Sequence, residues 1–546
     1  MSAYPVFNVD YYDNFRELLL GISEKYADKP AITWYTRRGE EQTRSYAQLG
    51  QDALCFGEAL CVAGLQGEHI AIASENSYEW IYAFLGITAS GSVAVCVDVE
   101  QSEQAILDMI LRANVKMLVA SASVAPLLSA ALLRSGVRIV VIGNCPEMQS
   151  IEQFCATGRE RVSAGERAAL KTKISKSQVA AIAFTSGTTS LPKPVLLSHY
   201  GMVTNASESI AMVTPTPKVF SSLPFYHTYG LTCGVMCILI SGANLGINGD
   251  MKRMGRDLMA FDPQIMFAVP LMVEMLHKKL MAGVEQAGKM RQVEKLFKIN
   301  AFLHRMGIRR PYRQLVEAKE KGMGQLETII CGGAHLSRVV AQNLLAFGIL
   351  VLEGYGITEC SPLISVNRKH SYEISSVGHL LPSFELKLCD GEIWVRGPSV
   401  MLGYYQDEQA TKQVLENGWF KTGDVGHYSH RKFLYITGRK KNLIVLKNGK
   451  KIAPEEIEAY LKELAIVREV VAYGAPNGSS ADDVKLAVMV YPDRDQCQGM
   501  SDYEILEHLQ QQVEQVNRKL PAYKQIQMVN LRSDEFEKTA SQKIKR

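Results

Sequence analysis

Hydroxyl and glycine residues crowd one short stretch of the chain, between an apolar run and a lysine. The stretch covers residues 182–199 and reads IAFTSGTTSLPKPVLLSH. Hydroxyl groups and exposed backbone N–H groups can bind phosphate oxygens, and the ammonium of Lys193 adds a positive charge. A Walker A loop is excluded, because its glycine spacing is absent and Pro194 follows the lysine. The stretch is therefore either a polyphosphate-binding loop or a Ser/Thr-rich surface turn.

Further clusters of reactive or glycine-rich residues follow at intervals towards the C-terminus. Residues 221–230 read SSLPFYHTYG, residues 332–336 read GGAHL, and residues 354–359 read GYGITE. Residues 422–424 read TGD, and residues 539–543 read TASQK. Each cluster taken alone fits a packed histidine, a turn or a solvated charge. Their order along one chain favours a shared site.

In this order the clusters resemble the adenylate-forming superfamily, which includes acyl-CoA synthetases, non-ribosomal peptide adenylation domains and beetle luciferases. The family's phosphate loop is usually S/T-S-G-S/T-T-G-x-P-K-G, and here Ser190 and Pro194 stand at two of its glycine positions. GYGITE matches the family's Y-G-x-T-E motif without departure. The CSPLISVN that follows, residues 360–367, is most similar to the long-chain fatty acyl-CoA ligase branch. The C-terminal pattern T-x-x-G-K is matched up to Lys543, except at Gln542.

The resemblance implies how these residues would bind ATP. The loop around Thr188 would hold the β and γ phosphates, Tyr355 would stack on adenine, and Asp424 would accept hydrogen bonds from both ribose hydroxyls. The glycine turn at 332–336 would line the acyl pocket and one face of adenine. The ATP-binding residues expected in this way are Thr185, Ser186, Gly187, Thr188, Thr189, Lys193, Gly333, Ala334, Glu353, Tyr355, Gly356, Thr358, Asp424, Arg439 and Lys543.

The same resemblance implies catalytic and metal-binding roles. Lys543 is expected to be the catalytic lysine, His227 to lie beside the carboxylate that is activated, and Thr188 to act with them. Glu359 and Thr188 are the expected Mg²⁺ ligands, since this ion prefers oxygen ligands. Lys441 occupies the hinge position of the family.

A two-step reaction follows from the resemblance. A carboxylate attacks the α-phosphorus of ATP, pyrophosphate leaves, and the thiol of coenzyme A then displaces AMP from the acyl-AMP. A medium- or long-chain fatty acid is the expected substrate. The segment LPFYHTYG lacks the aspartate with which amino-acid-activating relatives bind an ammonium group. The expected cofactors and cosubstrates are ATP, Mg²⁺ and coenzyme A.

Two alternative functions remain open. In the first, the acceptor is the phosphopantetheine of an acyl carrier protein. In the second, the chain is a catalytically weak or non-catalytic nucleotide-binding homologue, because Ser190, Pro194 and Gln542 replace glycines whose backbone angles other residues rarely adopt. Retained polar residues favour an enzyme. They are Thr188, Lys193, Glu359, Asp424, Arg439 and Lys543.

Composition is that of an ordinary globular protein. The 546 residues suggest about three to four modules, and the net charge of +4 predicts no nucleic-acid partner. The eleven cysteines form neither a metal-binding pattern nor a dense disulfide framework, which favours a reduced, cytoplasmic setting. The N-terminal segment MSAYPVFNVDYYDNF does not have the basic and apolar regions of a signal peptide.

Two segments bear on membrane contact. Residues 231–247, LTCGVMCILISGANLGI, are apolar but short and interrupted, so we expect a buried helix and turn instead of a transmembrane segment. Residues 278–321 carry twelve Lys or Arg against four acids. This basic helical region is either a solvated helix face or a surface for anionic lipid or the phosphates of coenzyme A, so peripheral membrane contact stays open.

The elements that position these residues alternate between helix and strand, which predicts a layered α/β fold with much parallel sheet. Helices are expected at 15–26, 49–63 and 80–89, and strands at 69–74, 93–97, 115–120, 137–142, 326–331 and 349–352. Residues 376–405 alternate as in a small antiparallel β subdomain. We therefore expect a large adenylation domain at 1–438 and, at 439–546, a small α+β lid, whose mobility the resemblance implies.

Overall fold

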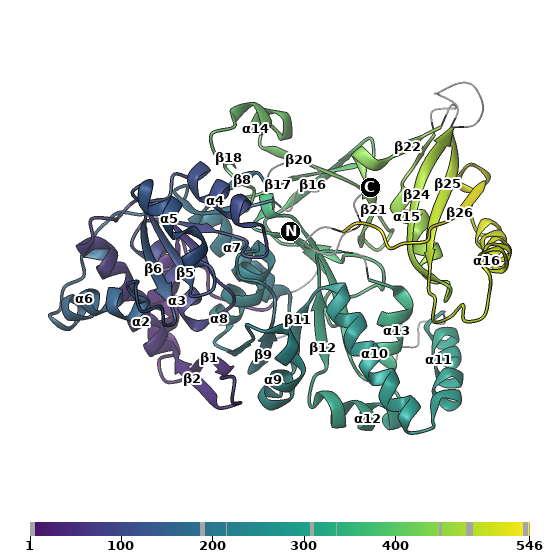
Figure 1. Cartoon of the computed structure of the whole chain (residues 1–546), viewed down its shortest axis with the longest axis horizontal. Coiled ribbons are helices and arrows are strands. Elements are labelled where there is room, and N and C mark those ends of the chain that lie inside the picture. Colours follow the sequence, from purple (N-terminus) through teal and green to yellow (C-terminus); the bar gives the residue numbers. More distant parts are fainter. Residues whose placement is uncertain are drawn as a thin grey trace. The chain divides into compact units, whose positions relative to one another are not determined.

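The chain forms two compact units in the computed structural model (Figure 1). The structure describes residues 6–185, 192–213, 216–305, 311–334, 336–446, 450–476, 484–538 and 544. The first unit contains Met1–Leu336, Val340–Glu385 and Arg396–Phe420. The second contains Ser337–Val339, Leu386–Val395 and Lys421–Arg546. The domain boundary that we predict at residue 439 stays a prediction.

Two large mixed sheets organise the first unit. In spatial order, the nine-stranded sheet contains β15 (His379–Leu380), β14 (Leu363–Val366), β13 (Leu350–Gly356), β12 (Thr328–Cys331), β11 (Ile265–Ala268), β9 (Lys218–Ser221), β10 (Asn244–Ile247), β1 (Pro30–Tyr35) and β2 (Glu41–Ser45). The seven-stranded sheet contains β18 (Gly403–Tyr404), β8 (Pro194–Ser198), β7 (Val179–Phe184), β4 (Val93–Cys96), β3 (His69–Ala73), β5 (Met117–Ser121) and β6 (Arg138–Ile142). The central strands are parallel and their apolar residues are buried, so the predicted layered α/β fold is confirmed.

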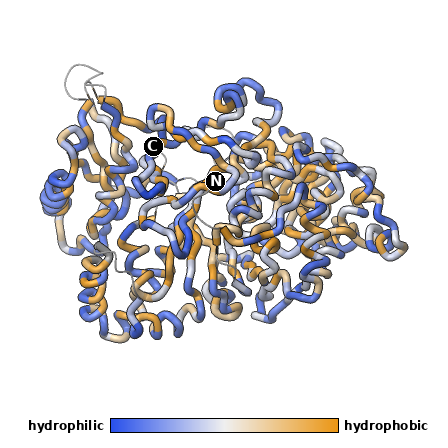
Figure 2. The backbone as a smooth tube through the Cα atoms, turned by 180° about the vertical axis from the view of Figure 1, so that it is seen from behind, coloured by the Kyte–Doolittle hydropathy of each residue, from blue (hydrophilic) through white to orange (hydrophobic). Residues whose placement is uncertain are grey.

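Helices pack on these sheets, and several are capped by the side chain of the residue that precedes them. Ser45 accepts a hydrogen bond from Gln48 N, and Gln48 Oε1 accepts one from Ser45 N, which fixes the start of α2. Figure 2 shows how hydrophobic and hydrophilic residues alternate along the helices. The helices are α1 (Phe15–Lys25), α2 (Tyr46–Val62), α3 (Tyr78–Ala89), α4 (Glu103–Arg112), α5 (Ala125–Arg134), α6 (Ile151–Ser163), α7 (His199–Met212), α8 (Cys237–Ser241), α9 (Met254–Phe261), α10 (Pro270–Gln286), α11 (Met290–Arg305), α12 (Arg313–Met323), α13 (Arg338–Ala346) and α14 (Glu408–Val414).

The apolar segment at 231–247 is buried, as expected. A π-helix, Tyr229–Met236, continues into α8, and Gly242 then turns the chain at φ +73° into β10. The strand at its end was not predicted. No helix among the described residues is long and apolar enough to cross a membrane.

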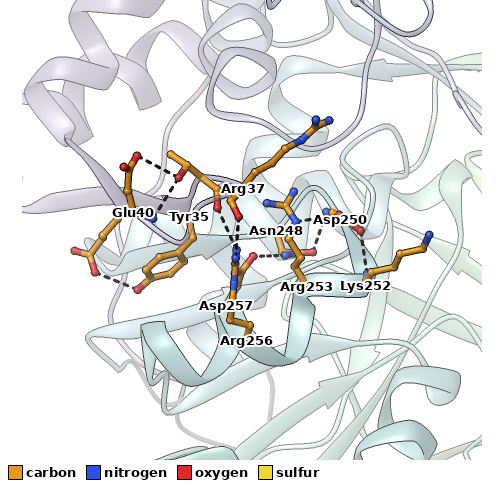
Figure 3. Close-up of polar contacts among 11 residues, drawn as sticks. Tyr35, Arg37, Glu40, Asn248, Asp250, Lys252, Arg253, Arg256 and Asp257 are labelled. Carbon is orange, nitrogen blue, oxygen red and sulfur yellow. Dashed lines mark hydrogen bonds and ion pairs between the residues drawn. The ribbon is translucent and has the colours of Figure 1, made fainter.

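An arginine fastens the β1–β2 hairpin to α9 (Figure 3). Arg256 donates to the carbonyl oxygens of Thr36 and Arg37, at 3.2 Å each. Its carboxylate neighbour Asp257 is buried and accepts a hydrogen bond of 2.6 Å from Asn248. These contacts are remote from the predicted site residues in sequence and hold the edge of the nine-stranded sheet.

The second unit combines an antiparallel sheet with a smaller α+β part. Most of the antiparallel sheet comes from β16 (Glu385–Cys389), β17 (Glu392–Arg396), β20 (Trp419–Tyr428) and β21 (Leu434–Arg439). A short pair follows, β22 (Ile444–Val445) and β23 (Lys451–Ile452). The three-stranded sheet β24 (Val467–Pro476), β25 (Val484–Pro492) and β26 (Met528–Leu531) packs with α15 (Pro454–Leu461) and α16 (Asp502–Asn517) around one hydrophobic core. This matches the predicted small α+β domain.

Candidate active site

The ends of the predicted phosphate loop, Thr185 and Lys193, are held together by a pair of hydrogen bonds. Thr185 N donates to the carbonyl oxygen of Lys193, and Lys193 N donates to Thr185 Oγ1, each at 3.1 Å. Strands β7 and β8 pair antiparallel on either side, so the loop closes a hairpin. The predicted residues Ser186, Gly187, Thr188 and Thr189 lie outside the described residues, as does Ser190.

Tyr404 connects the lysine of this loop with the predicted metal ligand Glu359. Its hydroxyl donates a hydrogen bond of 2.9 Å to Glu359 Oε1, and the ammonium of Lys193 lies 4.8 Å from the centre of its ring. The backbone places the tyrosine there, because Tyr404 pairs with Val195 of β8. Burial and the neighbouring Glu359 carboxylate raise the pKa of Tyr404, so the phenol remains a donor. One side chain thus contacts both a cation and a carboxylate.

The geometry around Glu359 suits Mg²⁺. No group of three or more His, Cys, Asp or Glu side chains in the described part of the chain is placed to hold a metal ion without other ligands. Mg²⁺ is commonly held by one or two carboxylates together with phosphate oxygens and waters. Glu359 is half-buried, and its backbone is fixed by Met401 N, which donates to the Glu359 carbonyl oxygen at 2.7 Å. An ionised carboxylate has about four lone-pair sites, so a carboxylate that accepts hydrogen bonds can also bind a cation.

Strand β13 delivers the Y-G-x-T-E motif. Tyr355 is buried, and Thr358 begins the short 3₁₀ helix Thr358–Cys360. A Cβ atom at Gly356 would lie 2.3 Å from the carbonyl oxygen of Pro362, so only glycine fits there. Buried Glu353 accepts a hydrogen bond of 3.2 Å from Ser375 N, and burial raises the pKa of its carboxyl to about 7.

An apolar pocket lies next to this motif within the first unit. It encloses about 60 Å³ of space accessible to water-sized groups, and about 530 Å³ when the adjoining open solvent is counted. Gly333, at φ +90°, and Gly356 come from the predicted set. The other lining residues are Ser209, Val213, Tyr229, Cys233, Cys237, Phe267, Ile330, Cys331, Gly332, Gly354, Pro362, Leu363 and Val366.

The pocket wall contains three thiols and one phenol, but the thiols are uncharged and the phenol hydroxyl is hydrogen-bonded within the protein. Burial raises the pKa of Cys233 to about 12 and that of Cys237 and Cys331 well above the usual range, so the thiols are neutral. The Tyr229 hydroxyl donates to the carbonyl oxygen of Ile330 at 2.9 Å. The wall therefore offers thiol sulfurs, aromatic rings and aliphatic carbons to a ligand.

His227, the histidine predicted to lie beside the substrate carboxylate, precedes the π-helix Tyr229–Met236. Its ring packs against that of Tyr226, with centroids 4.7 Å apart. Its carbonyl oxygen accepts from Leu231 N at 2.9 Å. This residue, His227, is half-buried, and its role at the acyl carboxylate stays a prediction.

The second unit holds the predicted ribose-binding pair. Asp424 and Arg439 face each other across β20 and β21, and Arg439 Nε lies 2.7 Å from Asp424 Oδ1. Asp424 is buried, whereas its arginine partner is exposed. Lys441, the predicted hinge, is exposed in the 3₁₀ helix Lys440–Asn442. Lys543 and Gln542 lie outside the described residues.

Comparison with known proteins identifies the family. The AMP-binding enzyme model matches residues 22–405, and the model of the AMP-binding enzyme C-terminal domain matches residues 441–546. The chain is therefore a member of the AMP-binding enzyme family, and the resemblance to the adenylate-forming superfamily is confirmed.

Individual relatives cover nearly the whole chain. A long-chain-fatty-acid–CoA ligase of Salmonella typhimurium is 28% identical over 90% of this chain and 89% of its own length. A chloroplastic long-chain-fatty-acid–[acyl-carrier-protein] ligase of Arabidopsis thaliana is 26% identical over 91% of this chain and 78% of its own. The solved structure of o-succinylbenzoate coenzyme A synthetase from Bacillus subtilis, in complex with ATP and magnesium ion, has a TM-score of 0.73 at 20% identity, over 97% of this chain and 98% of that one. The last comparison establishes the fold.

Proposed function

We propose that this protein activates a fatty acid with ATP and transfers the acyl group to the thiol of coenzyme A. The observation that carries the proposal is the apolar pocket, which shares Gly356 with the nucleotide-binding motif Y-G-x-T-E. An aliphatic chain in this pocket would have its carboxylate directed to the side where the motif binds the nucleotide. The relatives named as long-chain fatty acid ligases support this choice of acid.

The carboxylate of the acid must be activated before a thiol can displace one of its oxygens, because an oxide is a poor leaving group. A carboxylate oxygen attacks the α-phosphorus, the bond to the bridging oxygen breaks, and pyrophosphate leaves. The thiolate of coenzyme A then attacks the acyl carbon, and AMP leaves with the oxygen that the acid supplied. The first step brings two anions together, so cations around the forming bond lower its barrier.

Individual residues receive roles in this proposal. Lys193 neutralises charge on the β and γ phosphates, and Asp424 with Arg439 binds the ribose. Lys543 stabilises the developing charge at the α-phosphate, and Lys441 is the hinge. The loop residues Thr185, Ser186, Gly187, Thr188 and Thr189 line the phosphates, and Gly333, Ala334, Glu353, Tyr355, Gly356 and Thr358 surround adenine and the α-phosphate. Glu359 and Thr188 would hold Mg²⁺, which would supply positive charge when bound.

A carrier-protein acceptor is the second candidate, because one of the similar relatives is an acyl-carrier-protein ligase. Both reactions share the acyl-AMP intermediate and differ only in the thiol. A cytoplasmic setting is part of the proposal, and its support is that all eleven cysteines are free thiols.

Acid-dependent exchange of labelled pyrophosphate into ATP tests the proposal. We expect exchange with fatty acids in a panel that also contains aryl and bile acids, and AMP release on addition of coenzyme A. If none of the acids in the panel supports exchange, the enzyme assignment is contradicted. AMP release with acyl carrier protein but not with coenzyme A would select the second candidate.

A further inference from the structure

Helix α11 exposes a face that combines cations with large apolar side chains. Phe302 is 62% exposed and Ile299 is 51% exposed. Arg291, Lys295 and Lys298 are exposed on the same helix. We call these five residues the α11 face.

Helical geometry places the five side chains on one side of the helix. At about 100° per residue, Arg291, Lys295 and Lys298 fall within roughly 40° of the direction of Phe302, and Ile299 within about 60°. The only acid on the outer half of α11, Glu294, falls about 80° away. The stripe from Arg291 to Phe302 is about 16 Å long at 1.5 Å per residue.

The opposite side of α11 is packed into the first unit. Val293 is buried, and the ring of Phe297 meets that of Phe347 with centroids 6.1 Å apart. Asn300 donates a hydrogen bond of 3.3 Å to the carbonyl oxygen of Gln342. Figure 1 shows α11 beside α10, with which it is in contact. Because these contacts fix the rotation of the helix, its cations and its phenyl ring point outwards together.

The cations of this face, Arg291, Lys295 and Lys298, have no ion-pair partner among the residues that the structure describes. The same region holds a contrasting case in Lys319, which is buried and donates to the carbonyl oxygen of Gly324 at 3.0 Å. The three α11 cations therefore attract any anionic partner that reaches them.

We propose that the α11 face docks the protein on a bilayer with anionic headgroups. The three cations would lie at the level of the lipid phosphates, while Phe302 and Ile299 enter the boundary between headgroups and acyl chains. The exposed Phe302 and Ile299 favour a lipid surface over other polyanions. The phosphates of coenzyme A or of a nucleic acid offer no apolar layer for these side chains. The inference does not depend on which acid the enzyme activates.

Co-sedimentation with vesicles tests the proposal. The full chain should bind vesicles of equimolar phosphatidylglycerol and phosphatidylcholine, bind pure phosphatidylcholine far more weakly, and lose binding at high salt. A triple variant, Arg291→Gln, Lys295→Gln and Lys298→Gln, should lose on the order of a hundredfold in affinity, at about fivefold per cation. Phe302→Ser should weaken binding without changing its salt dependence.

Matched controls separate this face from general charge and exposure. Lys116, Lys171 and Lys173 are exposed and lie in other parts of the first unit. Their triple change to Gln removes the same charge and should leave binding unchanged. Leu133 on α5 is 62% exposed, like Phe302, and Leu133→Ser should also have no effect. If the control variants and the α11 variants bind equally well, the proposal is wrong.

Two further readouts distinguish docking from an effect on the enzyme. Pyrophosphate exchange with octanoate in the absence of vesicles should be the same in the wild type and all variants. A higher KM for coenzyme A in the α11 triple variant, with unchanged vesicle binding, would assign the face to coenzyme A and overturn the lipid proposal. Phe302→Trp should show fluorescence quenching by brominated phosphatidylcholine in mixed vesicles, and absence of quenching would exclude insertion.

Discussion

Replacing Tyr404 by phenylalanine removes a hydrogen bond that joins its hydroxyl to the Glu359 carboxylate. The bond measures 2.9 Å, and the tyrosine is 7% exposed. Hydrogen bonds to charged groups contribute about 1.5 to 3 kcal/mol. Water replaces part of the bond because Glu359 is only half-buried, so we expect the lower end, about 1.5 kcal/mol or roughly tenfold.

The effect should be seen as a weaker response to Mg²⁺ if Glu359 is a metal ligand. We expect Tyr404→Phe to raise the Mg²⁺ concentration for half-maximal pyrophosphate exchange about tenfold. Tyr404→Leu also removes the ring beneath Lys193, at 4.8 Å, and should lose about another 0.5 to 1 kcal/mol.

Tyr405→Phe is the matched control, because this tyrosine, the next residue along the chain, packs against His69 instead, with ring centroids 5.5 Å apart. In a Glu359→Gln background, Tyr404→Phe should have little further effect, since the charged acceptor is already gone. Equal Mg²⁺ responses of Tyr404→Phe and Tyr405→Phe would refute the reasoning. So would an undiminished effect of Tyr404→Phe in the Glu359→Gln background.

Three further changes test other parts of the site. Burial raises the pKa of Glu353 to about 7 from 4.5, so the folded chain holds a proton that the unfolded chain releases and stability falls as pH rises through this window. Urea unfolding at about pH 5 and pH 8 measures this loss. In the Glu353→Gln variant, the decrease in the free energy of unfolding between the two pH values should be smaller by about 2 to 3 kcal/mol. Cys237→Phe fills the apolar pocket and should lower kcat/KM for palmitate more than for hexanoate; equal losses would argue against an acyl chain there. Asp424→Asn should raise the KM for ATP about tenfold without changing that for the acid, since it weakens the contact with Arg439 at 2.7 Å.

Much of the fold was predictable, because apolar runs of strand length are typical of buried strands. The segments at 69–74, 93–97 and 137–142 became β3, β4 and β6 within a residue or two. By contrast, β10 was hidden, since its four residues, Asn244–Ile247, are too few to show a strand pattern after the apolar run that precedes them. The edge pairing of β18 with β8 joins Tyr404 to Val195, and two-residue strands leave no periodic pattern.

Residues of the candidate site could be proposed from the sequence where they are contiguous, but not where the fold brings distant residues together. GYGITE is a single segment, so the order of its residues is enough to identify the motif. Tyr404 lies 45 residues beyond Glu359, and no spacing rule links a tyrosine to a carboxylate over that distance. The cysteines of the pocket come from a helix and a strand, and in the sequence they indicate only buried, reduced thiols.

Transfer of oxygen from the acid to AMP tests the central claim most directly. The enzyme would be given a fatty acid labelled with ¹⁸O in both carboxylate oxygens, together with ATP, Mg²⁺ and coenzyme A, and the products analysed by mass spectrometry. Attack of the carboxylate on the α-phosphorus predicts one ¹⁸O in AMP and one in the thioester. Label in inorganic phosphate, or in neither phosphate nor AMP while thioester forms, would contradict an acyl-AMP intermediate.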